Sequence, residues 1–199
     1  WAFVVAALWA RAAQAQLPAR DFGNLVYPAK GNIQLDEGTV DLWVICNFDS
    51  EWDTKSRPEW ACLFSIEFPD EKWRYPLKFL GWGHSLAFIG YTKPQQAHAW
   101  GGNLVWKPGE VHHVVVTWSG RKRSVFVDGN CQYKNKEGQP YTTCDRLVEG
   151  VIRGDLTNAG LVVGADSSHL TMDEIQIRRI ALTPDEVAKA KDAPLVADA

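Results

Sequence analysis

Short apolar runs of strand length, separated by turn-forming residues, recur along most of this chain. They occupy residues 32–35, 39–46, 61–68, 85–91, 111–118, 124–127, 161–164 and 172–178. The runs are rich in Val, Ile, Phe and Trp, and Asp128-Gly129 supplies a tight hairpin turn after one of them. Many short strands with Gly- and Pro-rich turns predict an all-β fold, in which two antiparallel sheets pack as a sandwich or jelly roll.

One short helix is expected near the C-terminus. Thr183 stands at the N-cap position, Pro184 follows at the first helical position, and Glu186 comes three residues after the threonine. This pattern is a capping box and predicts a helix that runs through about Lys191. No internal repeat or linker marks a second domain, so we expect one sandwich domain over residues 31–191 and a flexible tail over 192–199.

The first 15 residues have the pattern of a secretory signal peptide. An apolar run of about 10 residues, too short to span a membrane, leads to the small-residue stretch Ala13-Gln14-Ala15. We therefore expect cleavage after residue 15, an N-terminal extension over residues 16–30, and a secreted or periplasmic protein without a membrane anchor. The alternative is a buried N-terminal helix.

The cysteine count agrees with export, and the charge count bears on nucleic-acid binding. An exported chain meets oxidising conditions, in which an even number of cysteines usually pairs. Three connectivities are open, and we favour the local pairs Cys46 with Cys62 and Cys131 with Cys144. The 21 Lys and Arg residues do not exceed the 24 Asp and Glu residues, so the chain lacks the basic excess typical of nucleic-acid binding.

Several motifs together resemble a known family of secreted domains. In chain order they are 38–44 (GTVDLWV), 107–118 (KPGEVHHVVVTW), 127–129 (VDG), 161–164 (LVVG), 172–177 (MDEIQI) and 181–187 (ALTPDEV). This series resembles the laminin-G-like, concanavalin A-like lectin and glucanase jelly-roll domains. The resemblance implies two antiparallel sheets, often with a structural calcium ion, and a role in binding sugars or other proteins.

The resemblance also points to a calcium site. Asp173 lies in the segment that matches the last strand of the family, whose aspartate commonly supplies an oxygen to the ion. Carbonyl oxygens near Gly31 and Asn32 are candidates for further ligands, because calcium takes several oxygen ligands. The alternative is that Asp173 hydrogen-bonds the backbone of the first strand.

Acidic and histidine residues suggest little catalytic chemistry. Asp49, Glu51 and Asp53 alternate, and in a strand they would share one face as the carboxyls of a glycosidase do. Their polar surroundings favour a solvated loop instead, with a loop calcium site as a further alternative. His112 and His113 are neighbours in a predicted strand, so they should point to opposite faces and serve structural roles.

Tryptophan is abundant, with ten residues in the chain. Trp43 and Trp118 fall inside predicted strands and are expected in the core, whereas Trp52, Trp82 and Trp100 fall in or beside the irregular middle. Exposed indole rings often mark contact sites, and flat rings stack on sugars. For each of these three residues the alternative is a ring packed under a loop.

We therefore expect a binding module rather than an enzyme. Its ligand is expected to be a carbohydrate, contacted by Trp52, Trp82 and Trp100. One alternative is a structural or adhesion domain with an extracellular protein partner, and another is a glycan hydrolase or lyase that uses loop carboxylates. Fold resemblance alone does not choose among these functions.

Overall fold

A computed structural model describes residues 3–4, 25–46, 62–69, 73–80, 85–92, 95–103, 106–131, 146–147, 151–164 and 170–192 of the protein. Along β1, β5, β7 and β11, in β6 apart from Leu86 and Phe88, and at Leu170 and Asp173 of β13, it describes the backbone alone. The strands are β1 (Phe3–Val4), β2 (Leu25–Pro28), β3 (Glu37–Cys46), β4 (Cys62–Glu67), β5 (Trp73–Leu80), β6 (Ser85–Thr92), β7 (Gln95–Asn103), β8 (Val111–Ser119), β9 (Lys122–Val127), β10 (Asn130–Cys131), β11 (Arg146–Leu147), β12 (Gly160–Val163) and β13 (Leu170–Arg178). A 3-10 helix covers Leu156–Asn158, and α1 covers Pro184–Lys191.

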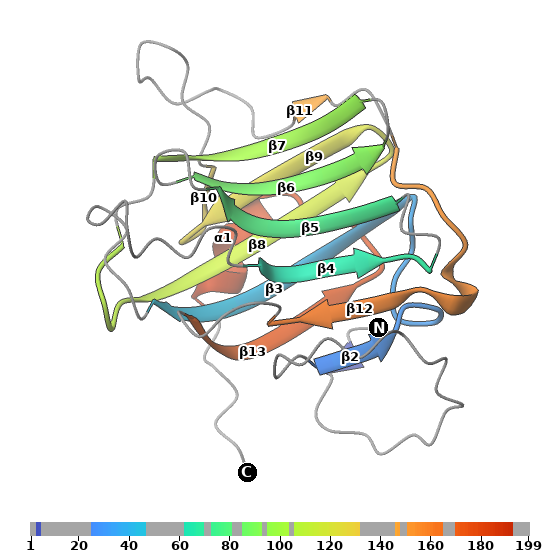
Figure 1. The fold of residues 1–199 in the computed structure, drawn as a ribbon. Helices are drawn as coiled ribbons and strands as arrows, with labels where there is room; N and C mark the ends of the chain where they lie inside the picture. Colours follow the sequence, from blue (N-terminus) through green and yellow to red (C-terminus); the bar gives the residue numbers. More distant parts are fainter. Residues whose placement is uncertain are drawn as a thin grey trace.

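These strands form two layers (Figure 1). Sheet A has the order β1-β13-β3-β8-β9-β10, with β11 also paired to β9, and sheet B has the order β2-β12-β4-β5-β6-β7. All pairings between these strands are antiparallel. The prediction of a two-sheet antiparallel β-sandwich with a short C-terminal helix is therefore confirmed.

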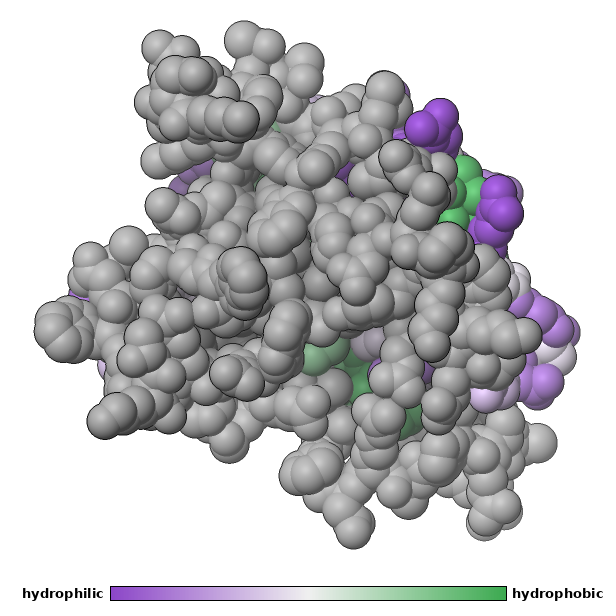
Figure 2. Space-filling view, turned by 45° about the horizontal axis from the view of Figure 1, so that its top comes forward, coloured by the Kyte–Doolittle hydropathy of each residue, from purple (hydrophilic) through white to green (hydrophobic). Residues whose placement is uncertain are grey.

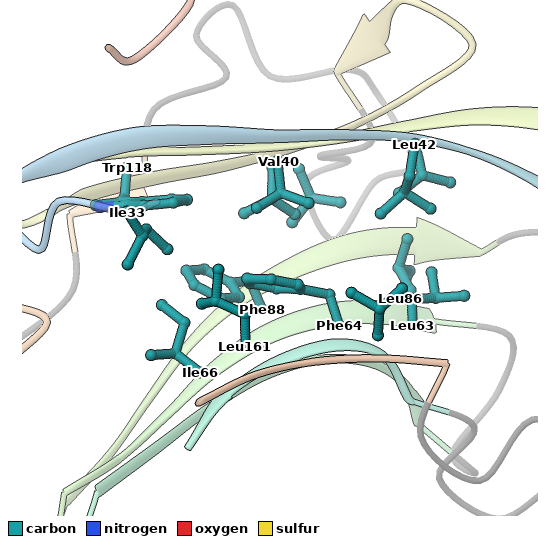
Figure 3. Close-up of a cluster of buried hydrophobic side chains, with 14 of the residues drawn as sticks. Ile33, Val40, Leu42, Leu63, Phe64, Ile66, Leu86, Phe88, Trp118 and Leu161 are labelled. Carbon is teal, nitrogen blue, oxygen red and sulfur yellow. The ribbon is translucent and has the colours of Figure 1, made fainter. Parts of the chain in front are cut away.

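The core lies between the two sheets. In β3, Val40, Leu42 and Val44 are fully buried at alternate positions, as expected for a strand with one face toward the interior. Figure 3 shows Phe64 and Phe88 of sheet B facing the layer that contains Val40 and Leu42. Large aromatic and aliphatic side chains from both layers therefore close the space between the sheets.

Trp118 of β8 is one of the largest of these buried side chains. Its side chain is almost completely buried, and its indole N–H donates to the carbonyl of Gln34 at 3.1 Å. A buried indole needs such a partner, because an unsatisfied donor costs free energy. The expectation that Trp118 belongs to the core is confirmed.

Helix α1 covers part of the outer face of sheet A. Its predicted capping box is present, because Thr183 Oγ1 accepts the Glu186 N–H at 3.4 Å and the Thr183 N–H donates to Glu186 Oε2 at 2.8 Å. Val187 packs in a small buried cluster with Val115 and Phe126, which alternate with core residues in β8 and β9. The helix therefore lies on the side of sheet A that faces away from sheet B.

A single hydroxyl anchors the chain that leads into α1. Thr39 Oγ1 of β3 donates to the Ile180 carbonyl at 2.7 Å and accepts the Leu182 N–H at 3.0 Å. Because Thr39 is fully buried, both bonds are shielded from water. They hold the segment between β13 and α1 against the sheet.

The surface of the described residues is mainly polar. Figure 2 shows a face on which hydrophilic side chains border the few hydrophobic ones that are visible among them. The exposed large hydrophobic residues include Leu25 and Val26 of the edge strand β2, at 58% and 50% exposure. The described part of the chain contains no helix with the length and hydropathy that a membrane span requires.

One predicted strand is wrong. Residues 32–35 do not form a strand, and only Ile33 makes an isolated bridge, to Lys30. The N–H groups of Asn32 and Ile33 both donate to the Ala29 carbonyl at 3.1 Å, and Gly31 has a φ of +89°. A left-handed glycine therefore turns the chain here, and the turn overrides the short apolar pattern.

Strands β2, β5 and β7 were not expected from the sequence. β2 lies within residues 16–30, the range assigned to an N-terminal extension, and pairs with β12. β5 contains Pro76 and β7 contains two glycines, which are residues of low strand propensity. Pairing with neighbouring strands, rather than intrinsic preference, therefore holds these segments in sheet B.

Candidate functional site

The face of sheet B that points away from the core is the first candidate surface. Figure 3 shows Phe64, Ile66 and Phe88 on the side of this sheet that faces sheet A. Phe64 and Ile66 of β4, and Leu86 and Phe88 of β6, are fully buried on the core side. Residues that alternate with them belong to the other side of the sheet, because successive residues of a strand face opposite ways.

The strand register defines which positions share this side. Glu67, Arg74, Tyr91 and Gln96 form one row of successive partners across β4, β5, β6 and β7. A second row joins Lys78, Ala87 and Trp100. With the pairs of Ser65 with Pro76 and of Ile89 with His98, these positions make up what we call the outer face of sheet B.

The described side chains at these positions range from buried to partly exposed, and Ser65 is only 2% exposed. Glu67 is partly exposed, and Ser65 Oγ lies 3.5 Å from Glu67 Oε1. Val162 of β12 is the register partner of Ser65 and is 7% exposed. By register, the outer face of sheet B combines aromatic residues with an amide, two cations and a carboxylate, which are groups suited to a ligand that is both flat and polar.

The outer face of sheet A has a different character, because its polar groups bond one another. His113 Nε2 lies 2.7 Å from Asp41 Oδ1, and Arg178 Nη2 lies 3.5 Å from Asp41 Oδ2. Arg178 also donates to Gln176 Oε1, and Gln176 donates in turn to Glu174 Oε1, each at 2.8 Å. This ladder ties β8, β3 and β13 together across the sheet.

Trp43 lies on the same outer face of sheet A and not in the core. It is partly buried, and its ring centroid lies 4.7 Å from that of His113. The expectation that Trp43 belongs to the core is therefore wrong. The polar residues Thr39 and Asp41, which share its alternation in β3, were the signal in the sequence that this face is not the core face.

His112 belongs to a separate cluster at the start of β8. Its ring stacks on Trp106, with 4.1 Å between centroids and 12° between planes. Its Nδ1 lies 2.9 Å from Asp128 Oδ2, and its Nε2 lies 3.4 Å from Glu110 Oε2. As expected for neighbours in a strand, His112 and His113 occupy opposite faces of the sheet.

Asp128 carries a perturbed pKa in this cluster. Burial raises the pKa of its carboxyl, but hydrogen bonds from the His112 ring and the His113 backbone outweigh that effect, together with the charges of His112 and Lys191. The pKa therefore lies below its ordinary value of 3.8. The cluster joins the hairpin turn after β9 to the segment that precedes β8, and we assign it a structural role.

Of the proposed calcium ligands, the Gly31 carbonyl is already engaged in a hydrogen bond. The Gly31 carbonyl accepts a hydrogen bond from the Arg179 guanidinium, and the Asn32 side chain donates to the Pro28 carbonyl at 2.8 Å. A calcium ion at this turn would have to displace a cation. Asp173 lies in β13, but its side chain is outside the described part, so the calcium site stays a prediction.

No metal cluster appears among the side chains that the structure describes. Within that part, no group of three or more His, Cys, Asp or Glu residues is placed to hold a metal ion. Asp49, Glu51 and Asp53 lie outside the described residues, as do Trp52 and Trp82. Their predicted roles stay predictions.

The cysteine pairing also stays a prediction. Cys46 belongs to the core cluster between the sheets. Cys62 is buried at the start of β4, where its Sγ donates to the Phe64 carbonyl at 3.3 Å. Cys131 ends β10, and Cys144 lies outside the described residues.

Comparisons with solved structures find the same architecture in larger proteins. The ligand-binding domain of botulinum neurotoxin serotype D, in complex with N-acetylneuraminic acid, matches with a TM-score of 0.56 and 12% identity, over 85% of this chain and 39% of that one. The receptor-binding domain of a botulinum neurotoxin mosaic serotype C/D matches with a TM-score of 0.52 and 10% identity, over 79% of this chain and 36% of that one. The chain thus spans about two fifths or less of these neurotoxin domains.

A third similar structure is domain 4 of an extracellular arabinanase from Geobacillus stearothermophilus, in complex with arabinotriose. Its TM-score is 0.48 at 17% identity, over 77% of this chain and 66% of that one. No curated protein matches the sequence. The family model of the concanavalin A-like lectin/glucanases superfamily matches residues 21–188, which include both sheets from β2 onward. The chain is therefore a member of the concanavalin A-like lectin/glucanases superfamily.

Proposed function

We propose that this domain recognises carbohydrate on the outer face of sheet B and does not cleave it. The observation that carries the proposal is the register that brings Trp100, Tyr91, Gln96 and His98 to one side of sheet B. Indole and phenol rings stack on the apolar faces of sugar rings, while amide and imidazole groups orient hydroxyls.

The position of the helix supports this choice of sheet. Helix α1 packs on Val115 and Phe126, so it covers sheet A and not sheet B. The polar groups of the ladder on sheet A also contact one another, as His113, Asp41 and Arg178 do, and are therefore engaged within the protein. The neurotoxin serotype D domain, of which this chain matches 39%, is itself in complex with a saccharide, N-acetylneuraminic acid.

The proposal keeps Trp52 and Trp82, which lie outside the described residues, as predicted ligand contacts. The proposal includes export of the protein to a compartment where glycans are present, as the N-terminal 15 residues indicate. A glycan-cleaving activity would instead need a pair of carboxyls about 5 to 9 Å apart across the ligand.

A glycan panel tests the proposal. The domain is applied to neutral and acidic glycans as wild type and as Trp52→Ala, Trp82→Ala and Trp100→Ala, with Trp100→Phe as the matched control that keeps an aromatic ring. We expect Trp100→Ala to weaken binding about tenfold and Trp100→Phe to retain most of it. If the panel yields no bound glycan, or if all three alanine variants bind as the wild type does, the proposal fails.

A protein-binding role is the second candidate, and one observation favours it. Leu25 and Val26 are exposed at 58% and 50% on β2, the edge strand of sheet B. Exposed apolar residues on an open strand edge are typical of sites that pair with another chain. An adhesion domain of this kind would no longer bind its protein partner after Val26→Lys. Its binding would be unaffected by Trp100→Ala.

A further inference from the structure

We propose that the outer face of sheet B selects acidic saccharides, which carry carboxylate or sulfate groups, over neutral ones. This inference rests on the proposed function and specifies its ligand class. It derives from the charges that the strand register places on that face.

Two cations occupy this face on the same strand. Arg74 and Lys78 alternate with the positions of β5 that pair with buried residues, namely Leu77 with Phe64 and Phe79 with Leu86. The two cations are four positions apart, which corresponds to about 13 Å along a strand. Both basic residues of β5 therefore belong to the side away from the core.

Acidic residues are scarce at the same positions. Among the described strands β4 to β7, Glu67 is the single acidic residue that the register assigns to this face, and its partner is Arg74. The register partners of Lys78 are Cys62 and Ala87, neither of which carries a negative charge. The face therefore has a net positive charge, although the whole chain has a formal charge of −3.

The second row places a cation near an aromatic residue. Lys78, Ala87 and Trp100 are successive partners on three neighbouring strands. Strands lie almost 5 Å apart, so the backbones of Lys78 and Trp100 are separated by about 10 Å. Alanine, a small residue, lies between them. The row thus places a cation and an aromatic residue two strands apart, a spacing suited to a saccharide with an anionic group.

The first row offers a second position for an anion. Arg74 is followed by Tyr91 on β6 and by Gln96 on β7. A guanidinium binds carboxylate and sulfate through paired N–H donors, and an amide orients hydroxyls. A neutral saccharide would use the aromatic residues and the amide but would gain nothing from the two cations. The charge pattern therefore favours an acidic ligand.

Isothermal titration with three tetrasaccharides of equal length tests the proposal: one of a uronic acid, one sulfated and one of a neutral hexose. We expect the wild type to bind an acidic probe at least about tenfold more tightly than the neutral one. The two acidic arms show whether carboxylate or sulfate is preferred, and a preference for either supports the proposal.

Variants identify the residues responsible. Arg74→Gln and Lys78→Gln should each weaken the binding of the acidic probe about fivefold and leave the binding of the neutral probe unchanged. Lys189→Gln, which removes an exposed cation of α1 on the other sheet, is the matched control and should change neither. Circular dichroism and thermal unfolding confirm that each variant is folded.

The remaining outcomes separate this inference from the proposed function. Equal binding of neutral and acidic probes, with loss on Trp100→Ala, would retain carbohydrate recognition and overturn acidic selectivity. A third outcome is that the acidic probes bind Trp100→Ala as tightly as the wild type and that this binding is lost at high salt concentration. It would overturn both proposals, because it would show general ionic attraction. Absence of binding to all three probes would overturn both as well.

Discussion

Replacing Gly38 with alanine tests the packing between β3 and β8. Gly38 is the register partner of Trp118, whose ring fills the core end of this strand pair. A Cβ at position 38 would lie 2.2 Å from Cζ2 of Trp118 and 2.7 Å from Cη2. Nonbonded carbons lie about 3.5 Å or more apart, so the ring would have to move by about 1.3 Å.

The structure sets the size of the effect. Overpacking a close-packed core costs about 1–3 kcal/mol. Displacement of the Trp118 indole from the Gln34 carbonyl, now at 3.1 Å, adds about 1 kcal/mol. Replacing glycine within a strand recovers about 0.5–1 kcal/mol of chain entropy. We therefore expect Gly38→Ala to lower the free energy of unfolding by about 1.5–3 kcal/mol.

Urea unfolding followed by circular dichroism measures this change as a lower midpoint at constant slope. Trp118→Phe is the matched variant, because a smaller ring leaves room for the new methyl group. The double variant Gly38→Ala/Trp118→Phe should therefore lose less stability than the sum of the two single variants, by about 1 kcal/mol. A Gly38→Ala midpoint equal to that of the wild type, or strict additivity in the double variant, would refute the reasoning.

Two further predictions concern the polar clusters. Asp128→Asn should lower stability by about 1 kcal/mol at neutral pH, because it weakens the contacts to His112 and the His113 N–H. The pKa of Asp128 is lower in the folded state, so its stabilising effect is present above its unfolded pKa and is lost as the pH falls through the folded value. The difference in urea midpoint between wild type and Asp128→Asn should therefore shrink on acidification below about pH 4, and a constant difference would contradict the assignment. For the calcium hypothesis, a chelator should lower the thermal midpoint of the wild type but not of Asp173→Ala, and equal wild-type midpoints with and without chelator would exclude a stabilising ion.

Much of the fold could be predicted from local patterns. The alternation of β3 and β8, the Asp128-Gly129 turn and the Thr183 capping box each depend on a few neighbouring residues. Such signals are visible in one sequence because the pleat and the helix cap impose short, regular spacings. The strands that were missed, such as β5 with its internal Pro76, depend on pairing with neighbouring strands, whereas residues 32–35 failed because Gly31 turns the chain locally.

The candidate site could be predicted only in part. Trp100 was singled out as a ligand contact, and the structure places it in β7, in register with Ala87. Arg74, Lys78 and His98 were missed, because their strands had not been recognised and no local motif joins them. The alternation of Arg74 and Lys78 with hydrophobic residues in 73–80 was the available signal.

The sequence by itself determined the class of fold, because hydrophobic alternation and turn chemistry act over a few residues. It also determined the helix cap and the opposite facing of His112 and His113. Only the tertiary structure decided that Lys78 and Trp100 share one row across three strands. The physical reason is that strand order and register arise from pairing between distant segments, which close the core together, whereas each segment alone carries only its own periodicity.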